Sequence, residues 1–193
     1  LSSLLHDVYA MFSIKAEEKG LDFTVEAEED IPAVLYGDEI RIKQVLSNLL
    51  SNAVKYTEKG SIGLTVGWEP MDEQTAELFF TVKDSGIGIR EEDIDTIFEK
   101  FKRFDAKRNS KVEGTGLGMN ITAQLLRLMD GKIVVHSDYG VGSEFEVRIP
   151  QKITDATPMG TYSYTPQKKA EEEVRETFTA PMGKMLVVDD NPM

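Results

Sequence analysis

The sequence contains no cysteine and only two histidines, His6 and His136. The absence of cysteine excludes disulfide bonds, thiolate metal sites and a cysteine nucleophile. Two histidines are also too few for a histidine-rich metal centre. The chain lacks any apolar run near the roughly 18 residues that cross a bilayer, and its N-terminus lacks the pattern of a signal peptide. We therefore expect a cytoplasmic domain, even where the full-length protein is membrane-anchored.

Basic residues are in the minority. The chain has 22 Lys and Arg against 34 Asp and Glu among 193 residues, which gives a formal net charge of −12. Nucleic acids are bound by clustered Lys and Arg side chains, so this balance argues against a nucleic-acid partner. Hydrophobic residues at 40% and charged residues at 29% are typical of a globular chain. At about 150 residues per domain, the length predicts one domain and a remainder.

The composition changes near residue 150. Residues 1–150 alternate helical and strand patterns with glycines between them, whereas residues 151–182 contain scattered Pro, Ser and Thr and a run of charges. We interpret the first segment as the domain and the second as a linker. Residues 183–193 combine an apolar run with two aspartates. This pattern predicts the first strand of a further, truncated domain, so we expect the chain to be a fragment.

Hydrophobic periodicity predicts both helices and strands in residues 1–150. Apolar residues at helical spacing predict three helices, over residues 3–18, 38–56 and 117–129. Runs rich in β-branched and aromatic residues predict strands over 21–27, 61–68, 76–83, 132–137 and 143–149. Residues 31–37 are predicted to form an extended connection. The pattern favours an α/β (α+β) fold, with a mixed sheet covered by helices on one face.

Polar residues follow one side of the predicted helix over residues 38–56. Asn48, Asn52, Lys55 and Tyr56 lie at helical spacing, displaced from the apolar stripe. Asparagine has a poor helix propensity, and broken local rules often mark functional sites. An amide oxygen can bind Mg²⁺, and a lysine one turn later can contact phosphate. The alternative is that both asparagines form hydrogen bonds in the core while Lys55 is solvated.

A first glycine-rich segment, DSGIG, follows the predicted strand over residues 76–83. It contains Asp84, Gly86 and Gly88. Glycine permits backbone angles and close approaches that a Cβ atom blocks. A buried Asp84 carboxylate can accept a hydrogen bond from an exocyclic amine such as that of adenine. The alternative is an Asx turn that closes a loop.

A second glycine-rich segment, GTGLG at residues 114–118, leads into the third predicted helix. Free N–H groups at a helix N-terminus favour an anion. The segment is not a Walker A loop, because no Gly-Lys-Ser/Thr follows, and it is not a dinucleotide-binding fingerprint, because no strand precedes it. Between the two glycine segments, aromatic residues at 98, 101 and 104 and a basic stretch at 107–111 suit a mobile lid. Ordinary core or loop packing is the alternative for the aromatic residues.

The four segments NLLSNAVKYT, DSGIG, FEKF and GTGLG resemble, in this order and spacing, the N, G1, F and G2 boxes of sensor histidine kinases. The resemblance covers residues 1–150 and implies the catalytic ATP-binding domain of the histidine kinase and gyrase (GHKL) type. Its implied fold is a two-layer sandwich with a mostly antiparallel sheet. The segment KMLVVDDN resembles the first strand and acidic pair of a receiver domain. A kinase core followed by a receiver domain resembles a hybrid histidine kinase.

The resemblance implies ATP and Mg²⁺ as ligands and a role for each matching residue. Asn52 would bind Mg²⁺ with assistance from Asn48, and Lys55 and Tyr56 would contact phosphate and the sugar or base. Asp84 would bind the adenine amine, while Gly86 and Gly88 would shape the pocket. Arg103 would contact the γ-phosphate. The phosphates would also receive backbone N–H groups from the second glycine segment: Gly114, Thr115, Gly116, Leu117 and Gly118.

Asn48 also bears on the type of reaction. The related gyrase and heat-shock-chaperone ATPases have a water-activating glutamate one turn before the asparagine that binds Mg²⁺. Here that position is Asn48, which cannot act as a general base. We therefore expect transfer of the γ-phosphoryl group to a protein histidine rather than hydrolysis of ATP.

The phosphoacceptor histidine is expected outside this chain. His6-Asp7 lacks the basic residue and the Asn/Thr-Pro pair of acceptor motifs, and His6 lies only 46 residues before Asn52. We expect His6 on a helix surface and His136 in a sheet. The expected partners are a dimerisation and phosphoacceptor hairpin of the same full-length protein, itself a homodimer, and a receiver domain, while the fragment is expected to be a monomer. One alternative is a non-catalytic, nucleotide-responsive module whose lid regulates a partner domain, and a weaker one is a gyrase-type hydrolase.

Overall fold

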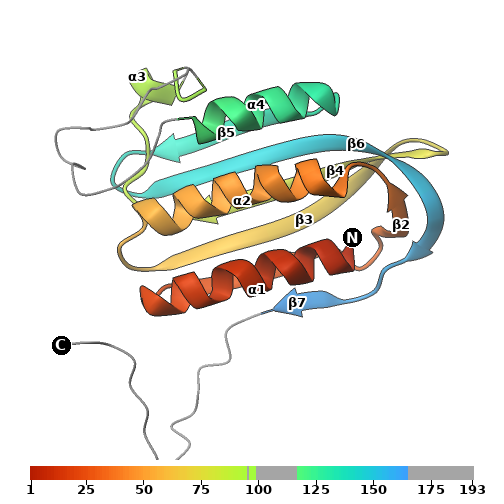
Figure 1. Ribbon diagram of the computed structural model, residues 1–193, viewed down its shortest axis with the longest axis horizontal. Coiled ribbons are helices and arrows are strands. Elements are labelled where there is room, and N and C mark those ends of the chain that lie inside the picture. Colours follow the sequence, from red (N-terminus) through yellow and green to blue (C-terminus); the bar gives the residue numbers. More distant parts are fainter. Residues whose placement is uncertain (95, 99–116, 165–193) are drawn as a thin grey trace, which may run out of the picture.

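The computed structural model describes residues 1–94, 96–98 and 117–164. Within these residues, helices cover one face of a seven-stranded sheet, so the fold has two layers (Figure 1). The helices are α1 (Ser2–Glu18), α2 (Glu39–Tyr56), the short α3 (Glu91–Ile94) and α4 (Gly118–Leu128). The strands are β1 (Asp22–Ala27), β2 (Pro32–Tyr36), β3 (Ser61–Asp72), β4 (Thr75–Asp84), β5 (Lys132–Asp138), β6 (Gly142–Pro158) and β7 (Tyr162–Tyr164). None of these helices combines the length and apolarity that a bilayer span requires.

The sheet is mixed and mostly antiparallel, which confirms the predicted fold class. Its strands follow the order β2-β6-β4-β3-β1-β7, and β5 also pairs with β6. Only the β1–β3 pair is parallel among the described strands. The long β3–β4 hairpin therefore occupies the centre of the sheet, and β6 lies beside it.

The alternation of side chains along β4 positions the first candidate functional residue. Successive residues of a strand point to opposite faces of a sheet. Ala76, Leu78, Phe80 and Val82 are all buried beneath the helices, and the same alternation makes Asp84 the last inward-facing residue of the strand. The carboxylate of Asp84 is therefore placed in the layer between sheet and helices by the pattern that builds the core.

The helix α2 supplies the opposite wall of this layer. Its N-cap residue is Asp38, whose side chain accepts a hydrogen bond from the backbone N–H of Arg41 at 3.0 Å. Its apolar face is buried against the sheet and the other helices through Ile42, Val45, Leu46, Leu49, Leu50, Ala53 and Val54. This face fixes the rotation of α2 about its axis and so turns the adjacent polar side toward α4.

The sheet extends beyond the predicted domain boundary. Residues 151–158 continue β6, and residues 162–164 form β7, which pairs with β1. The prediction that a linker begins at residue 151 is therefore wrong for these residues. The predicted extended connection over 31–37 contains β2, which pairs with the second half of β6. Residues 165–182 of the predicted linker and the predicted receiver strand at 183–193 lie outside the described residues.

Candidate functional site

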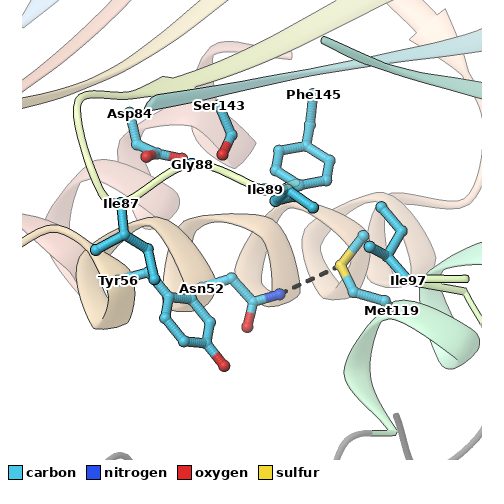
Figure 2. Close-up of a pocket in the computed structure, with 10 residues that line it drawn as sticks. All are labelled: Asn52, Tyr56, Asp84, Ile87, Gly88, Ile89, Ile97, Met119, Ser143 and Phe145. Atoms are coloured by element: carbon cyan, nitrogen blue, oxygen red, sulfur yellow. Dashed lines mark hydrogen bonds between the residues drawn. The ribbon is translucent and has the colours of Figure 1, made fainter. Parts of the chain in front are cut away.

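A small cavity of about 50 Å³ lies between the sheet and the helices (Figure 2). The cavity is surrounded by side chains from the end of α2, the end of β4 and the start of β6, together with α4 and the loop that follows β4. Its lining residues are Asn52, Tyr56, Asp84, Ile87, Gly88, Ile89, Ile97, Met119, Ser143 and Phe145. An apolar cavity with a few convergent polar groups is typical of a small-molecule site.

Asp84 is the one charged residue among the described residues that line the cavity. The residue is only 8% exposed, and its Oδ1 accepts a hydrogen bond from the Gly86 N–H at 2.8 Å. Burial raises the pKa of Asp84, while hydrogen bonds from the backbone of Gly86 and Ser143 act in the opposite direction. The Asx-type contact left open by the sequence is therefore present. The carboxylate keeps further lone pairs, so it can accept a hydrogen bond from an amine in the cavity.

Both glycines of DSGIG are required by their surroundings. A Cβ atom on Gly86 would lie 2.5 Å from the carbonyl oxygen of Tyr56 and 2.8 Å from Oδ1 of Asp84. Gly88 has a φ of +66°, and a Cβ atom there would collide with the carbonyl oxygen of Asp138. The two glycines thus let the loop pass close to the end of α2 and to β5.

The two asparagines of α2 both contact α4. The Nδ2 atom of Asn52 donates to Sδ of Met119 at 3.2 Å, the contact drawn in Figure 2. The Nδ2 atom of Asn48 donates to the carbonyl oxygen of Gly118 and to Oγ1 of Thr122, both at 3.3 Å. The alternative interpretation, that both asparagines form hydrogen bonds within the protein, is therefore correct for their amide nitrogens. Their amide oxygens are not used in these contacts.

The donor set at Asn52 fits a Mg²⁺ ion that is held chiefly by phosphates and water. In the described part of the chain, no group of three or more His, Cys, Asp or Glu residues could hold a metal ion. Mg²⁺ at nucleotide sites takes one or two protein ligands and fills its octahedron with water and phosphate oxygens. The amide nitrogen of Asn52 is a donor with no free lone pair, so Oδ1 is the atom that would bind the ion.

Lys55 and Tyr56 have different positions. Tyr56 lines the cavity, whereas Lys55 does not. The Nζ atom of Lys55 lies 5.0 Å from the centre of the Tyr56 ring, so its charge lies over the aromatic side chain beside the cavity. Its half-buried position suits a contact with the charged part of a ligand rather than with a base inside the cavity.

Leu117 and Gly118 form the start of α4. Leu117 is the N-cap residue, and within the described residues no side chain caps this end of the helix. Uncapped N–H groups at a helix N-terminus can bind an anion. The other predicted residues of the lid and of the second glycine segment, Arg103, Gly114, Thr115 and Gly116, lie outside the described residues.

Several residues of the cavity were not predicted from the sequence. Ser143 and Phe145 reach it because β6 pairs with β4 in a register that places Ser143 opposite Asp84. Met119 reaches it because α4 packs on α2. Ile87 and Ile89 could have been predicted to line the cavity, because they alternate with the glycines of the DSGIG segment. The register and the helix packing follow from tertiary contacts, for which one sequence carries no direct signal.

Comparison with known proteins identifies the family. The family model described as histidine kinase-, DNA gyrase B-, and HSP90-like ATPase matches residues 37–153. Hybrid signal transduction histidine kinase B of Dictyostelium discoideum is 41% identical over 140 residues, which are 72% of this chain and 7% of that protein. The chain thus spans a small part of this relative.

Solved structures give the same result. Full-length ShkA in complex with AMPPNP matches with a TM-score of 0.69 and 32% identity, over 80% of this chain and 30% of that one. The catalytic domain of the histidine kinase ThkA in a nucleotide-free form matches with a TM-score of 0.61 and 32% identity, over 77% of this chain and 92% of that one. The chain belongs to the family of histidine kinase-, DNA gyrase B- and HSP90-like ATPases, and within it to the ATP-binding catalytic domains of histidine kinases.

Proposed function

We propose that this chain binds ATP with Mg²⁺ and donates the γ-phosphoryl group to a histidine on a separate dimerisation and phosphoacceptor hairpin of the same full-length protein. The single observation that carries the proposal is the buried Asp84 carboxylate in an apolar cavity that also contains Asn52. The adenine base of ATP would enter between Asp84 and Asn52. The phosphates of ATP would then extend toward the start of α4.

Each described residue has a defined part in this reaction. Asp84 accepts a hydrogen bond from the exocyclic amine of adenine, and Tyr56 and the apolar loop residues pack against the base. Asn52 would hold Mg²⁺, which supplies charge neutralisation on the phosphates when bound. Lys55 contacts phosphate or sugar at the mouth of the cavity. The chain thereby orients the γ-phosphoryl group toward an incoming histidine nitrogen, which forms the new bond to phosphorus as the bond to the bridging oxygen breaks.

Asn48 supports transfer rather than hydrolysis. Its amide group is tied to α4 by the hydrogen bonds to Gly118 and Thr122. An amide cannot take a proton from water, so this position has no general base. We therefore propose that Asn48 assists by holding α2 and α4 together around the phosphates.

The same proposal covers the parts of the protein outside the described residues. Arg103 would contact the γ-phosphate, and residues 114–116 would complete the phosphate-binding N–H groups. Residues 183–193 would begin a receiver domain, in keeping with the name of the Dictyostelium relative as a hybrid kinase. The full-length protein would be a homodimer, this chain alone would be a monomer, and the domain would act in the cytoplasm.

The substitution Asp84→Asn tests the nucleotide assignment. A lost hydrogen bond to a buried charged group typically costs about 1.5–3 kcal/mol, so ATP affinity should fall by about 10- to 100-fold while the fold is kept. Titration calorimetry with Mg²⁺ and ATP measures this change. Asp155→Asn, at the opposite end of β6 from the cavity, is the matched control and should bind as the wild type does. Wild-type affinity in Asp84→Asn would contradict the adenine assignment.

A further inference from the structure

The C-terminal turn of α2 leaves two backbone carbonyls to be satisfied. The last four carbonyl groups of a helix have no partner within the helix. In α2, the Ala53 oxygen accepts from Thr57 N–H at 3.0 Å and the Tyr56 oxygen accepts from Ile87 N–H at 3.2 Å. The carbonyls of residues 54 and 55 have no backbone partner among the described residues, and they lie in the same turn as the cavity-lining Tyr56.

The side chain of Lys19 binds both remaining carbonyls. Its Nζ donates to the oxygen of Val54 at 2.6 Å and to that of Lys55 at 3.3 Å, and it contacts the oxygen of Thr57 at 3.4 Å. A cation at this end of a helix also interacts favourably with the helix dipole. Hydrogen bonds from a charged donor are stronger than those between neutral groups. The C-terminus of α2 is thus closed by a residue from another helix.

The end of α1 fixes the position of Lys19. Lys19 is the C-cap residue of α1, and the following Gly20 has a φ of +68°. Gly20 N–H donates to the Glu17 oxygen and Leu21 N–H to the Ala16 oxygen, both at 2.9 Å. These are the two hydrogen bonds of a Schellman motif. Figure 1 shows that α1 and α2 end at the same side of the molecule, so this cap directs Lys19 to the end of α2.

We propose that Lys19 is a positioning residue for nucleotide binding. It does not line the cavity, so it acts through α2. By holding the last turn of α2, its ammonium group sets the place of Asn52 and Tyr56. Through the hydrogen bond from Ile87 to the Tyr56 oxygen, it also sets the distance between α2 and the loop that follows Asp84. The inference rests on the proposed binding of ATP at this cavity.

The test compares Lys19→Met, which removes the charge and the donors, with Lys19→Arg, which keeps both. Lys15→Met is the matched control, because Lys15 lies on the same helix and its Nζ lies 5.1 Å from the ring centre of Phe12 of that helix. Calorimetry with Mg²⁺ and ATP gives the affinity. Hydrogen exchange of the Ile87 amide, measured without nucleotide, reports the link between α2 and the loop. Thermal unfolding confirms that each variant is folded, and Lys19→Gln replaces Lys19→Met if the latter does not fold.

Lys19→Met should weaken ATP binding by roughly 3- to 10-fold and speed exchange of the Ile87 amide, because the last turn of α2 loses its charged partner. Lys19→Arg should restore both values, and Lys15→Met should change affinity by less than about twofold. Unchanged affinity together with unchanged Ile87 exchange in Lys19→Met would overturn the role of Lys19. A folded wild-type chain that does not bind ATP would instead contradict the proposed function, and the exchange of Ile87 would then decide the role of Lys19 by itself.

Discussion

The buried carboxylate of Asp84 lowers the stability of the fold at neutral pH, and the same carboxylate is proposed to bind adenine. The carboxylate lies in a largely apolar environment, and burial raises its pKa above the ordinary value of 3.8. The folded chain therefore holds the Asp84 proton more tightly than the unfolded chain does. As the pH rises from 3.8 through the raised pKa, the contribution of Asp84 to the free energy of unfolding decreases. Above that pH the folded chain retains a buried charge, a cost that the proposed recognition of adenine would explain.

The substitution Asp84→Asn should for this reason raise the free energy of unfolding at neutral pH, although it should weaken ATP binding. Urea denaturation from about pH 4 to about pH 8 measures the effect, and the variant should lack the decline of the wild type with rising pH. Asp155→Asn is the control with the opposite sign. Hydrogen bonds from Thr157 lower the pKa of Asp155, so the wild-type residue stabilises the fold above pH 3.8, and this stability is lost only as the pH falls through the lowered pKa, below the range of the titration. Asp155→Asn should therefore be less stable than the wild type from about pH 4 to about pH 8. An Asp84→Asn variant that is less stable than the wild type at neutral pH would contradict a destabilising effect of the buried carboxylate.

Asn52 offers a second test at the level of one residue. Asn52→Asp keeps the oxygen that would bind Mg²⁺, adds a charge and removes the nitrogen that donates to Met119. The Mg²⁺ concentration that ATP binding requires should change by about 3- to 10-fold, with a smaller effect on the preference for adenine over guanine nucleotides. Gln44→Glu on the exposed side of α2 makes the same chemical change away from the cavity and should alter neither value. Equal metal dependence in Asn52→Asp and the wild type would remove Asn52 from the metal site.

At the level of elements, the C-terminal extension of the sheet is the main structural feature of the fold beyond residue 150. The second half of β6 pairs with β2, and β7 returns to pair with β1. The ring of Tyr164 stacks on that of Tyr9 from α1 at 4.6 Å between ring centres, and Tyr9 in turn stacks on Phe23 of β1 at 5.7 Å. The extension therefore ties α1 to the edge of the sheet.

A chain that ends at residue 150 should accordingly be less stable than one that ends at residue 164. The shorter chain loses the β2–β6 and β1–β7 pairs, which the longer chain keeps. Denaturant unfolding of the two chains measures the difference. Within the full chain, Tyr164→Ala should lower the free energy of unfolding by about 1–2 kcal/mol, because one stacked aromatic pair and its buried area are lost. The 73% exposed Tyr36 provides the control substitution, Tyr36→Ala, with little expected change. Equal stability of the two truncated chains would show that the extension is dispensable.

The sequence allowed the helices and the central strands to be predicted because their apolar spacing is regular. The polar side of α2 was predicted in the same way, and Asn52 and Tyr56 do line the cavity. The polar composition of residues 151–158 predicts a linker, whereas their strand structure depends on partners in β2 and β4. Ser143 and Met119 were missed for the same physical reason, since strand register and helix packing decide which side chains meet.

At the level of the whole molecule, the cavity forms where four elements end or begin. The ends of α2 and β4 and the starts of α4 and β6 gather at one end of the sandwich (Figures 1 and 2). This arrangement brings together residues that are far apart in the chain, from Asn52 to Phe145. Asp84 is the one charged residue that lines the cavity within the described residues, and the ammonium group of Lys55 lies over the ring of Tyr56 beside it, so the net charge of −12 is carried almost entirely outside the cavity.

The central claim is transfer of a phosphoryl group from bound ATP to a histidine outside this chain. The most direct measurement mixes the chain with the separately produced phosphoacceptor hairpin of its full-length protein, Mg²⁺ and ATP labelled in the γ-phosphate, and follows the label. We expect acid-labile label on the hairpin, none in a hairpin whose acceptor histidine is replaced by glutamine, and strongly reduced transfer with Asp84→Asn. ATP binding without label on the hairpin would contradict transfer and favour a nucleotide-responsive module, and release of labelled phosphate by the chain alone would favour a gyrase-type hydrolase.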